Sequence, residues 1–378
     1  MNRFRFLLLG CGLVLGWTIA APAGSIFTLL DSSIPIPQVL TRDGQAWAGN
    51  RTANGGPGGR YRNGMVTAIE YPPDAYVFEP TGISDDGSVV AGNIMLDDLV
   101  AYRWENGVLE PVLGAGDTFS VLGTGNPISA NGSILVGRFG SQTVHPGYWA
   151  AGDRTFLPIP QGAVTGDPAA ISADGSTIVG DILMPDGKSP AVWRHGELTL
   201  LPDLPDLSEE TFVLGPRAMN VSSDGSVIVG LVHSESATYL ARWTNNGLEL
   251  LGSPISDYDP LSFDFTDDGS IVSFSTGISM IWREEVGSKP FDAYAARHFG
   301  LSIQDVLPNY FGLTVLEMTP DGRYFSGTVH DGNYNQISFI AFLDPADYVV
   351  PEPSSLALAG CAAVGLLWAG RRSRSPRR

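Results

Sequence analysis

Apolar and polar positions along the chain form a unit that recurs seven times. Each unit has an apolar residue, Ser or Thr, one variable residue, Asp or Asn, and Gly, followed by a mostly apolar run. Self-similarity at a period of about 40–50 residues is typical of repeat folds in which each unit is one supersecondary element. The glycines of the units, spaced by 43 to 53 residues, are Gly44, Gly87, Gly132, Gly175, Gly225, Gly269 and Gly322.

Each unit predicts four short strands. Asp-Gly or Asn-Gly between apolar runs indicates a hairpin, and we expect a type I′ turn with positive φ at both residues. The β-branched run after the glycine, as in Ser176–Gly180, fits a buried strand. An aromatic residue and a second turn with an apolar strand follow, as at Asn106–Leu113. The aromatic residues 17 or 18 positions after the glycine are Tyr61, Trp104, Trp149, Trp193, Trp243 and Phe339, whereas Trp282 lies only 13 positions after Gly269.

Seven such units predict an all-β fold, a β-propeller of about seven four-stranded blades. A β-solenoid would use a shorter period, and paired sandwiches would not need an aromatic residue at a fixed offset. We expect the aromatic residues to pack between adjacent blades rather than to stack on a ligand. Because the last unit runs out after its third strand, Ser338–Leu343, we predict that Ile26–Leu30 completes the last blade and closes the ring. A short helix ending at Gly300 accounts for the 53-residue interval.

The N-terminal segment has the features of a secretory signal. Arg3 and Arg5 precede the apolar stretch Phe6–Ile19, and a small-x-small site follows at Ala21 and Ala23. This order predicts a signal peptide over residues 1–23 that is cut after Ala23. The secretion machinery is therefore an expected partner.

The C-terminal segment combines three elements at the end of the chain. Pro351-Glu352-Pro353 precedes the apolar stretch Ser354–Gly370, and Arg371, Arg372 and three further arginines follow. A helix of 17 residues spans about 25 Å, a marginal length for a hydrocarbon core of about 30 Å. Positive charge stays cytoplasmic, so the bulk of the chain is expected on the other side of the membrane. A permanent single-span anchor is the alternative.

This tail, residues 349–378, resembles the PEP-CTERM sorting signal of Gram-negative bacteria. The resemblance implies that an exosortase-type enzyme recognises Pro351, Glu352 and Pro353, with Arg371 and Arg372 as the basic end, during export to the cell surface. The unit at residues 171–180 is similar to the extracellular HAF-type repeat of surface proteins that carry this tail. The segment 291–319 resembles the linker before the final repeat of that family. The remaining residues, 24–348, form the expected propeller domain.

Charge narrows the range of partners. Residues 24–348 contain 15 basic and 39 acidic side chains, a formal net charge of −24. Such a surface repels nucleic acid and anionic lipid. Cys11 and Cys361 both lie in the terminal segments, so a hydrophobic core rather than a disulfide must hold the exported domain.

No catalytic, cofactor or metal residue is predicted. The chain has no nucleophile elbow and no phosphate-binding loop, and no pair of its five histidines has metal-ligand spacing. Calcium stays open as a ligand, because acidic residues supply hard oxygen atoms, although none of the acidic segments matches a full calcium loop. The histidines are His145, His195, His233, His298 and His330, and the acidic segments are Asp85-Asp86, Asp97-Asp98, Asp267-Asp268 and Asp331–Asn335.

We therefore expect an exported, non-enzymatic protein of the cell surface or extracellular matrix, a scaffold or binding platform with exopolysaccharide as a candidate partner. The alternative is a hydrolase or lyase that acts on extracellular polysaccharide from one propeller face, with two acids as catalytic acid and base. A third interpretation is an inert spacer. The sequence alone names no ligand.

Overall fold

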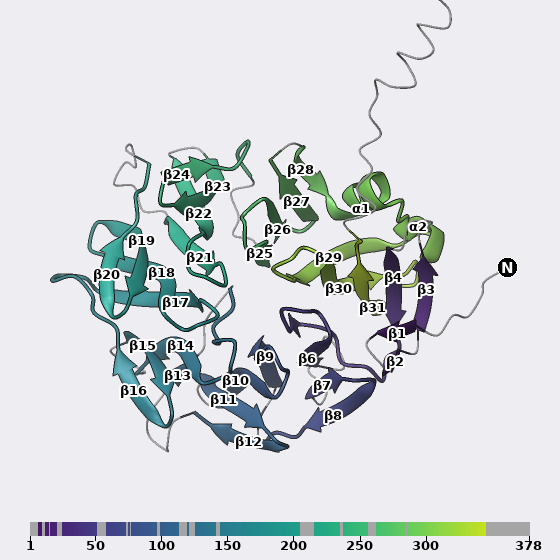
Figure 1. Cartoon of the computed structure of the whole chain (residues 1–378), viewed down its shortest axis with the longest axis horizontal. Coiled ribbons are helices and arrows are strands. Elements are labelled where there is room, and N and C mark those ends of the chain that lie inside the picture. Colours follow the sequence, from purple (N-terminus) through teal and green to yellow (C-terminus); the bar gives the residue numbers. More distant parts are fainter. Residues whose placement is uncertain are drawn as a thin grey trace, which may run out of the picture.

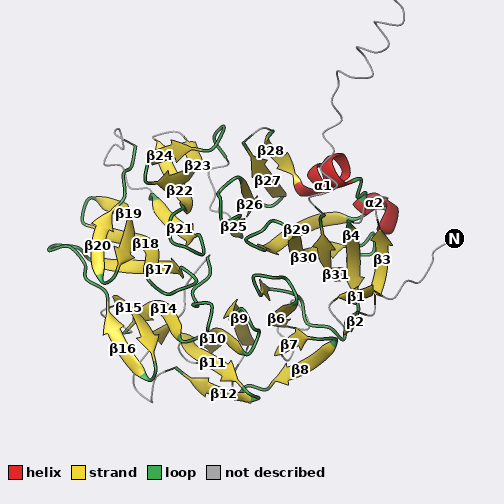
Figure 2. Ribbon diagram, viewed as in Figure 1, coloured by secondary structure: helices red, strands yellow, loops and turns green. Residues whose placement is uncertain are grey.

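In the computed structural model, seven antiparallel sheets are arranged radially about a common axis (Figures 1 and 2). In blades 1 to 6, four strands follow one another from the axis outward in chain order. The all-β prediction of a seven-bladed propeller is thus confirmed. The structure describes residues 7–9, 12–14, 16–20 and 25–344, without 51–57, 73–74, 76, 97–98, 113–118, 121–124, 141–143, 205–214, 235–236, 256–261 and 285.

Among the first three blades, the inner strands of blades 1 and 3 are only two residues long. Blade 1 consists of β5 (Val39–Leu40), β6 (Ala46–Asn50), β7 (Gly58–Arg62) and β8 (Met65–Ile69). Blade 2 consists of β9 (Val77–Ile83), β10 (Val89–Met95), β11 (Leu99–Glu105) and β12 (Val108–Pro111). Blade 3 consists of β13 (Phe119–Ser120), β14 (Ile134–Phe139), β15 (His145–Ala150) and β16 (Asp153–Phe156).

Blades 4 to 6 repeat the same order. Blade 4 consists of β17 (Thr165–Ile171), β18 (Thr177–Met184), β19 (Gly187–Arg194) and β20 (Glu197–Leu200). Blade 5 consists of β21 (Arg217–Val221), β22 (Ile228–Ser234), β23 (Ala237–Thr244) and β24 (Gly247–Leu250). Blade 6 consists of β25 (Phe263–Phe265), β26 (Ile271–Ser275), β27 (Ser279–Arg283) and β28 (Gly287–Pro290), and its short β26–β27 hairpin explains why Trp282 comes early.

Blade 7 joins the two ends of the described chain. Its strands β29 (Phe311–Met318), β30 (Tyr324–His330) and β31 (Gln336–Phe342) are followed in the sheet by β4 (Ile26–Leu30). Strand β4 pairs antiparallel with β31, and the ring of Phe27 stacks on that of Phe339 at 4.8 Å. The prediction that the N-terminal strand completes the last blade is confirmed.

Three further strands lie within the predicted signal peptide. Strand β3 (Gly16–Ala20) pairs with the outer edge of β4, which makes the last sheet five-stranded, and β1 (Leu7–Leu9) pairs with β2 (Gly12–Val14). Cleavage after Ala23 would remove all three and leave β4 as the outer strand of a four-stranded blade. Ala21 and Ala23 lie outside the described residues, so the signal peptide stays a prediction.

Two helices interrupt the repeat between β28 and β29. Helix α1 (Phe291–Phe299) ends at Gly300, which is left-handed with φ +64°, as the sequence predicts, and α2 (Ile303–Val306) follows. Both lie at the outer side of blade 7 (Figure 2). No helix in the part of the chain that the structure describes is long and apolar enough to cross a membrane. The predicted sorting tail, residues 349–378, is outside that part.

The core is divided into seven clusters, each shared by two neighbouring blades. The Trp104 side chain of blade 2, for example, packs with Val39 and Ala48 of blade 1. The indole N–H groups of Trp193 and Trp243 donate to proline carbonyls that follow the preceding blade, at 2.8 and 2.7 Å. Since large aromatic rings contribute most of the buried area in such contacts, each blade is held chiefly by its neighbours.

The two faces of the ring differ. The turns between first and second strands carry the repeated motif and lie on one side, here called the motif face. The turns between second and third strands, which differ in length from one blade to the next, lie on the opposite side with the linkers between blades, here called the variable-loop face. The chain between Ser25 and Asp344 begins and ends on the motif face, where the Asp344 N–H donates to Ser25 Oγ at 3.0 Å.

Closure by β4 makes a testable prediction. Phe27 is fully buried, so Phe27→Ala should lower the free energy of unfolding by about 3–5 kcal/mol through lost burial and a cavity. Urea denaturation of a protein comprising residues 24–348 measures the change. Phe156→Ala, a matched change at a half-exposed ring, should lower the free energy of unfolding by less than about 1 kcal/mol. Equal decreases in the two variants would show that β4 does not close the ring.

Candidate functional site

The repeated motif forms the same hydrogen-bonded turn in all seven blades. The Ser or Thr hydroxyl donates to the Asp or Asn side chain over 2.6–2.9 Å. That side-chain oxygen also accepts the N–H of the residue after glycine, and the hydroxyl accepts the N–H of the next residue, at the start of the second strand. The residue types of the motif are therefore explained by the turn itself.

The turn type differs from the predicted one. In all seven motif turns only the glycine has positive φ, between +67° and +79°, so the type I′ prediction is wrong for the motif. The physical reason is the side-chain oxygen of the Asp or Asn, whose bonds to the flanking hydroxyl and N–H hold that residue at negative φ. Turns with two residues at positive φ occur instead between third and fourth strands, at Asn63-Gly64, Asn106-Gly107, Ala151-Gly152 and His195-Gly196.

Successive motif turns are joined to one another through their variable residue. The N–H of Asp85 donates to the carbonyl of Ala130 at 2.8 Å, Ala130 donates to Ala173 at 2.9 Å, and Ala173 donates to Ser223 at 3.0 Å. Ser223 then donates to the Asp267 carboxylate at 2.7 Å, and Asp267 donates to a carbonyl at 2.9 Å. We call this chain of bonds around the axis the motif belt.

The belt changes where it reaches the last blade. The acceptor of the Asp267 N–H is Pro320, which has no N–H to pass on to blade 1. There the Gln45 side chain donates to the Tyr324 hydroxyl at 2.8 Å, and the Ser326 hydroxyl donates to the Pro37 carbonyl at 2.8 Å. Side chains thus replace backbone bonds at the junction that β4 closes.

Sequence reasoning missed an arginine that supports the belt. In four blades an arginine beside the third-strand aromatic residue donates to the carbonyl of the motif glycine in the next blade. The sequence does contain a sign of this role, because an arginine is adjacent to the third-strand aromatic residue in most units. The donors are Arg60 to Gly87 at 2.9 Å, Arg103 to Gly132 at 3.4 Å, Arg194 to Gly225 at 3.0 Å and Arg242 to Gly269 at 2.9 Å.

The acidic residues of the motif are occupied by these turns. Hydrogen bonds from Ser88 lower the pKa of Asp86 to about 2, and similar bonds lower the pKa values of Asp174 and Asp224. In the described residues there is no group of three or more His, Cys, Asp and Glu side chains that fits a metal ion. Of the calcium candidates, Asp85-Asp86 and Asp267-Asp268 lie in the belt, Asp331–Asn335 lies between β30 and β31, and Asp97-Asp98 is outside the described residues.

The structure does not bring the five histidines together. His233 is buried and its ring contacts the Thr238 hydroxyl at 2.9 Å. The other four lie in separate elements: His145 against Phe156, His195 in an outer turn, His298 against Tyr294 in α1, and His330 against Phe311.

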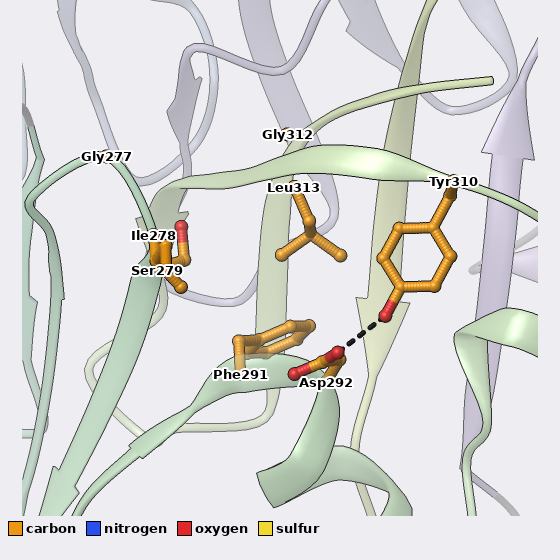
Figure 3. Close-up of a pocket in the computed structure, with 8 residues that line it drawn as sticks. All are labelled: Gly277, Ile278, Ser279, Phe291, Asp292, Tyr310, Gly312 and Leu313. Atoms are coloured by element: carbon orange, nitrogen blue, oxygen red, sulfur yellow. Dashed lines mark hydrogen bonds between the residues drawn. The ribbon is translucent and has the colours of Figure 1, made fainter. Parts of the chain in front are cut away.

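A pocket opens where the helical insertion meets blades 6 and 7. Its volume is about 170 Å³, below the roughly 300–1,000 Å³ of a drug-sized ligand site, which limits an occupant to a small group such as one sugar residue. Figure 3 shows the Tyr310 and Asp292 side chains pointing toward each other across it. The lining residues include Ile278, Ser279, Phe291, Asp292, Tyr310 and Leu313.

The polar groups of this pocket favour binding. The Tyr310 hydroxyl donates to Asp292 Oδ2 at 2.6 Å, and burial together with this bond raises the pKa of Tyr310, so the phenol stays a donor. Asp292 Oδ1 accepts the N–H of Ala293 in the first turn of α1, a position that favours negative charge. Apolar walls with one fixed polar pair suit a ligand that carries hydroxyl groups.

A second feature missed from the sequence is a pair of carboxyl groups on inner strands. Asp264 of β25 accepts the Met318 N–H at 3.0 Å and the Asn220 amide at 3.3 Å, and it shares a hydrogen bond with Glu317 of β29. Burial raises the pKa of Asp264 to about 7, and burial with the nearby Asp264 carboxyl raises the pKa of Glu317. The pair joins blades 6 and 7. The signal was the polar residue five positions before the motif glycine in three successive units.

Comparison with known proteins identifies the sorting motif in the tail. Residues 349–373 match the PEP-CTERM protein-sorting motif. No curated protein sequence matches the chain. Among solved structures, TolB from Acinetobacter baumannii is 10% identical with a TM-score of 0.42, covering 79% of this chain and 80% of its own. A protein described as TolB from Agrobacterium tumefaciens is 15% identical with a TM-score of 0.41, covering 58% of this chain and 80% of its own.

The carboxyl pair predicts a pH dependence of stability. Both pKa values are higher in the folded chain than the unfolded values of about 4. The pair therefore stabilises the fold below about pH 4, and this contribution is lost as the pH rises through about 7. Glu317→Gln keeps a hydrogen-bonding side chain but removes the titratable group. As the pH rises, the free energy of unfolding of wild type should therefore fall by up to about 1.4 kcal/mol per pH unit relative to this variant.

Urea unfolding at pH 5, 6, 7 and 8 measures that difference. Glu249→Gln is the matched control, because Glu249 is an exposed partner of Arg242 and its loss should shift the free energy of unfolding by less than about 1 kcal/mol at every pH. Parallel pH profiles for wild type and Glu317→Gln would contradict the assignment of a shared proton to this pair.

Proposed function

We propose that this protein is an exported, non-enzymatic binding platform of the cell surface or extracellular matrix, sorted by an exosortase-type enzyme. The observation that carries the proposal is the sorting motif at residues 349–373. An export signal of this kind places the propeller at the cell envelope. Its repeats would then be of the extracellular HAF type, and exopolysaccharide of a biofilm is the partner we favour.

The position of the chain ends supports the role of a platform. Asp344, the last described residue before the sorting tail, lies on the motif face beside Ser25. A tail inserted in the membrane would therefore hold the motif face toward the membrane. The variable-loop face, with the pocket at Asp292 and Tyr310, would point outward, where a large polymer can reach it.

We favour binding over polysaccharide hydrolysis or cleavage because of what the acidic residues do. The carboxyl groups of the motif hold turns, and Asp264 and Glu317 bond to each other between two blades. In the pocket, Asp292 bonds to a tyrosine rather than facing a second carboxyl group. A glycosidase needs two carboxyl groups on either side of a substrate bond, about 5–9.5 Å apart.

The sorting role predicts the behaviour of a tail variant. Replacing Pro351, Glu352 and Pro353 together by alanine should block processing, because the rigid tripeptide that sets off the apolar stretch is lost. In a host with an exosortase-type system, the full-length variant should accumulate in the membrane fraction as a larger, unprocessed species on immunoblots. Ser373→Ala, which leaves the tripeptide and the arginines intact, should behave as wild type. Normal processing of the triple variant would contradict the sorting assignment.

A further inference from the structure

One surface turn has a residue other than glycine at the position where every motif turn has a glycine with positive φ. The turn Asp331–Tyr334 connects β30 to β31 on the variable-loop face, and the N–H of Tyr334 donates to the Asp331 carbonyl at 3.0 Å. The same bond, from the fourth residue to the first, closes each motif turn, with glycine in the fourth place at φ +67° to +79°. Here the fourth place is taken by Tyr334 at φ +66°.

Local stability does not explain a tyrosine at this position. A side chain with a Cβ is disfavoured at such a φ, where glycine or asparagine fits with less strain. The tyrosine gains little burial in return, because 79% of its surface is exposed. Strain of this kind, held by a well-bonded surrounding turn, is typical of functional positions.

The turn is held rigidly around the strained residue. Asp331 Oδ1 accepts the N–H groups of Asn333 at 2.8 Å and Asn335 at 2.9 Å, and Oδ2 accepts the Asn335 side-chain amide at 3.0 Å. The Asp331 N–H donates to the Asn335 carbonyl at 3.0 Å. The backbone of the turn, and with it the direction of the Tyr334 Cα–Cβ bond, is thus fixed before any ligand arrives.

The Tyr334 ring is part of an exposed aromatic cluster. It meets the ring of Phe311 edge-on at 4.9 Å and 66°, and Phe311 stacks on His330 at 5.3 Å and 17°. Phe311 is itself 40% exposed. Its neighbours Tyr310 and Gly312 line the pocket described above, so the cluster and the pocket share the start of β29.

We propose that Tyr334 and Phe311 form a stacking site for a neutral polysaccharide, with one sugar ring lying on Tyr334. This inference rests on the proposed function and assigns its site. A pyranose ring has a flat face of C–H groups and a rim of hydroxyls, which suits an exposed aromatic ring beside the polar side chains of Asn333 and Asn335. Rigid aromatic side chains bind with a small loss of conformational entropy. The formal net charge of −24 over residues 24–348 opposes chains rich in uronate or sulfate.

The test uses native affinity electrophoresis of residues 24–348 in gels containing hydroxyethylcellulose, dextran or polygalacturonate. We expect one of the neutral polymers to retard wild type and polygalacturonate not to. Tyr334→Asn should weaken binding at least about tenfold, as for a hot-spot aromatic residue. Tyr334→Phe should keep binding, and Phe156→Asn, a change at an exposed ring of blade 3, should bind as wild type.

The melting temperature of Tyr334→Asn shows whether the substitution relieves backbone strain or damages the fold. Relief of the positive φ should raise the melting temperature of Tyr334→Asn by roughly 1–3 °C above wild type, while Tyr334→Phe should not gain. Binding by Tyr334→Asn equal to wild type would overturn the site and leave the binding platform standing. A wild type that none of the polymers retards would overturn polysaccharide binding itself. A third outcome is that no polymer retards wild type, but wild type self-associates with rising concentration and Tyr334→Asn does not. That outcome would overturn the inference and indicate a contact between copies of this chain.

Discussion

The bond between neighbouring motif turns is the interaction on which this structure depends. Seven blades become one body because their aromatic residues pack against neighbouring blades and because hydrogen bonds join successive motif turns. Most of these bonds are between backbone groups, and side chains take over at the remaining junctions. The variable residue of the motif supplies the belt, and the arginines of the third strands support it from outside. At most junctions the belt uses only the backbone of that variable residue, which explains why residues as different as alanine, serine and aspartate can occupy the position.

Period and turn chemistry were enough to predict the architecture. The seven motifs, the third-strand aromatic residues and the orphan strand Ile26–Leu30 led to a closed ring because each is a local pattern with a fixed spacing. The turn type was predicted wrongly, because Asp-Gly alone does not reveal that the Asp side chain bonds to a hydroxyl two residues earlier. The pocket at Asp292 and Tyr310 could not be predicted, since Asp292 lies in α1 and Tyr310 just before β29, and only the folded ring brings them together.

The repeat also gives a way to recognise function. All seven motif turns place glycine at the position with positive φ. The turn at Asp331–Tyr334 places a tyrosine there, so comparison with the motif turns of the same chain singles it out. The structural bonds are concentrated on the motif face, where the described part of the propeller begins and ends at Ser25 and Asp344. The departures from the repeat are concentrated on the opposite face. These departures are the helical insertion, the pocket and the aromatic cluster. A division of this kind suits a protein that is tethered on one side and binds on the other.

Hydrogen exchange of individual belt amides tests this account most directly. The N–H groups of Asp85 and Asp267 lie in exposed residues of surface turns, where exchange is ordinarily fast. The account predicts that these amides, with those of Ala130 and Ala173, exchange only when the whole ring unfolds, as slowly as the amides of Val90 in the core. Exchange at the rate of ordinary surface turns, with core strands still protected, would show that the blades do not depend on the belt.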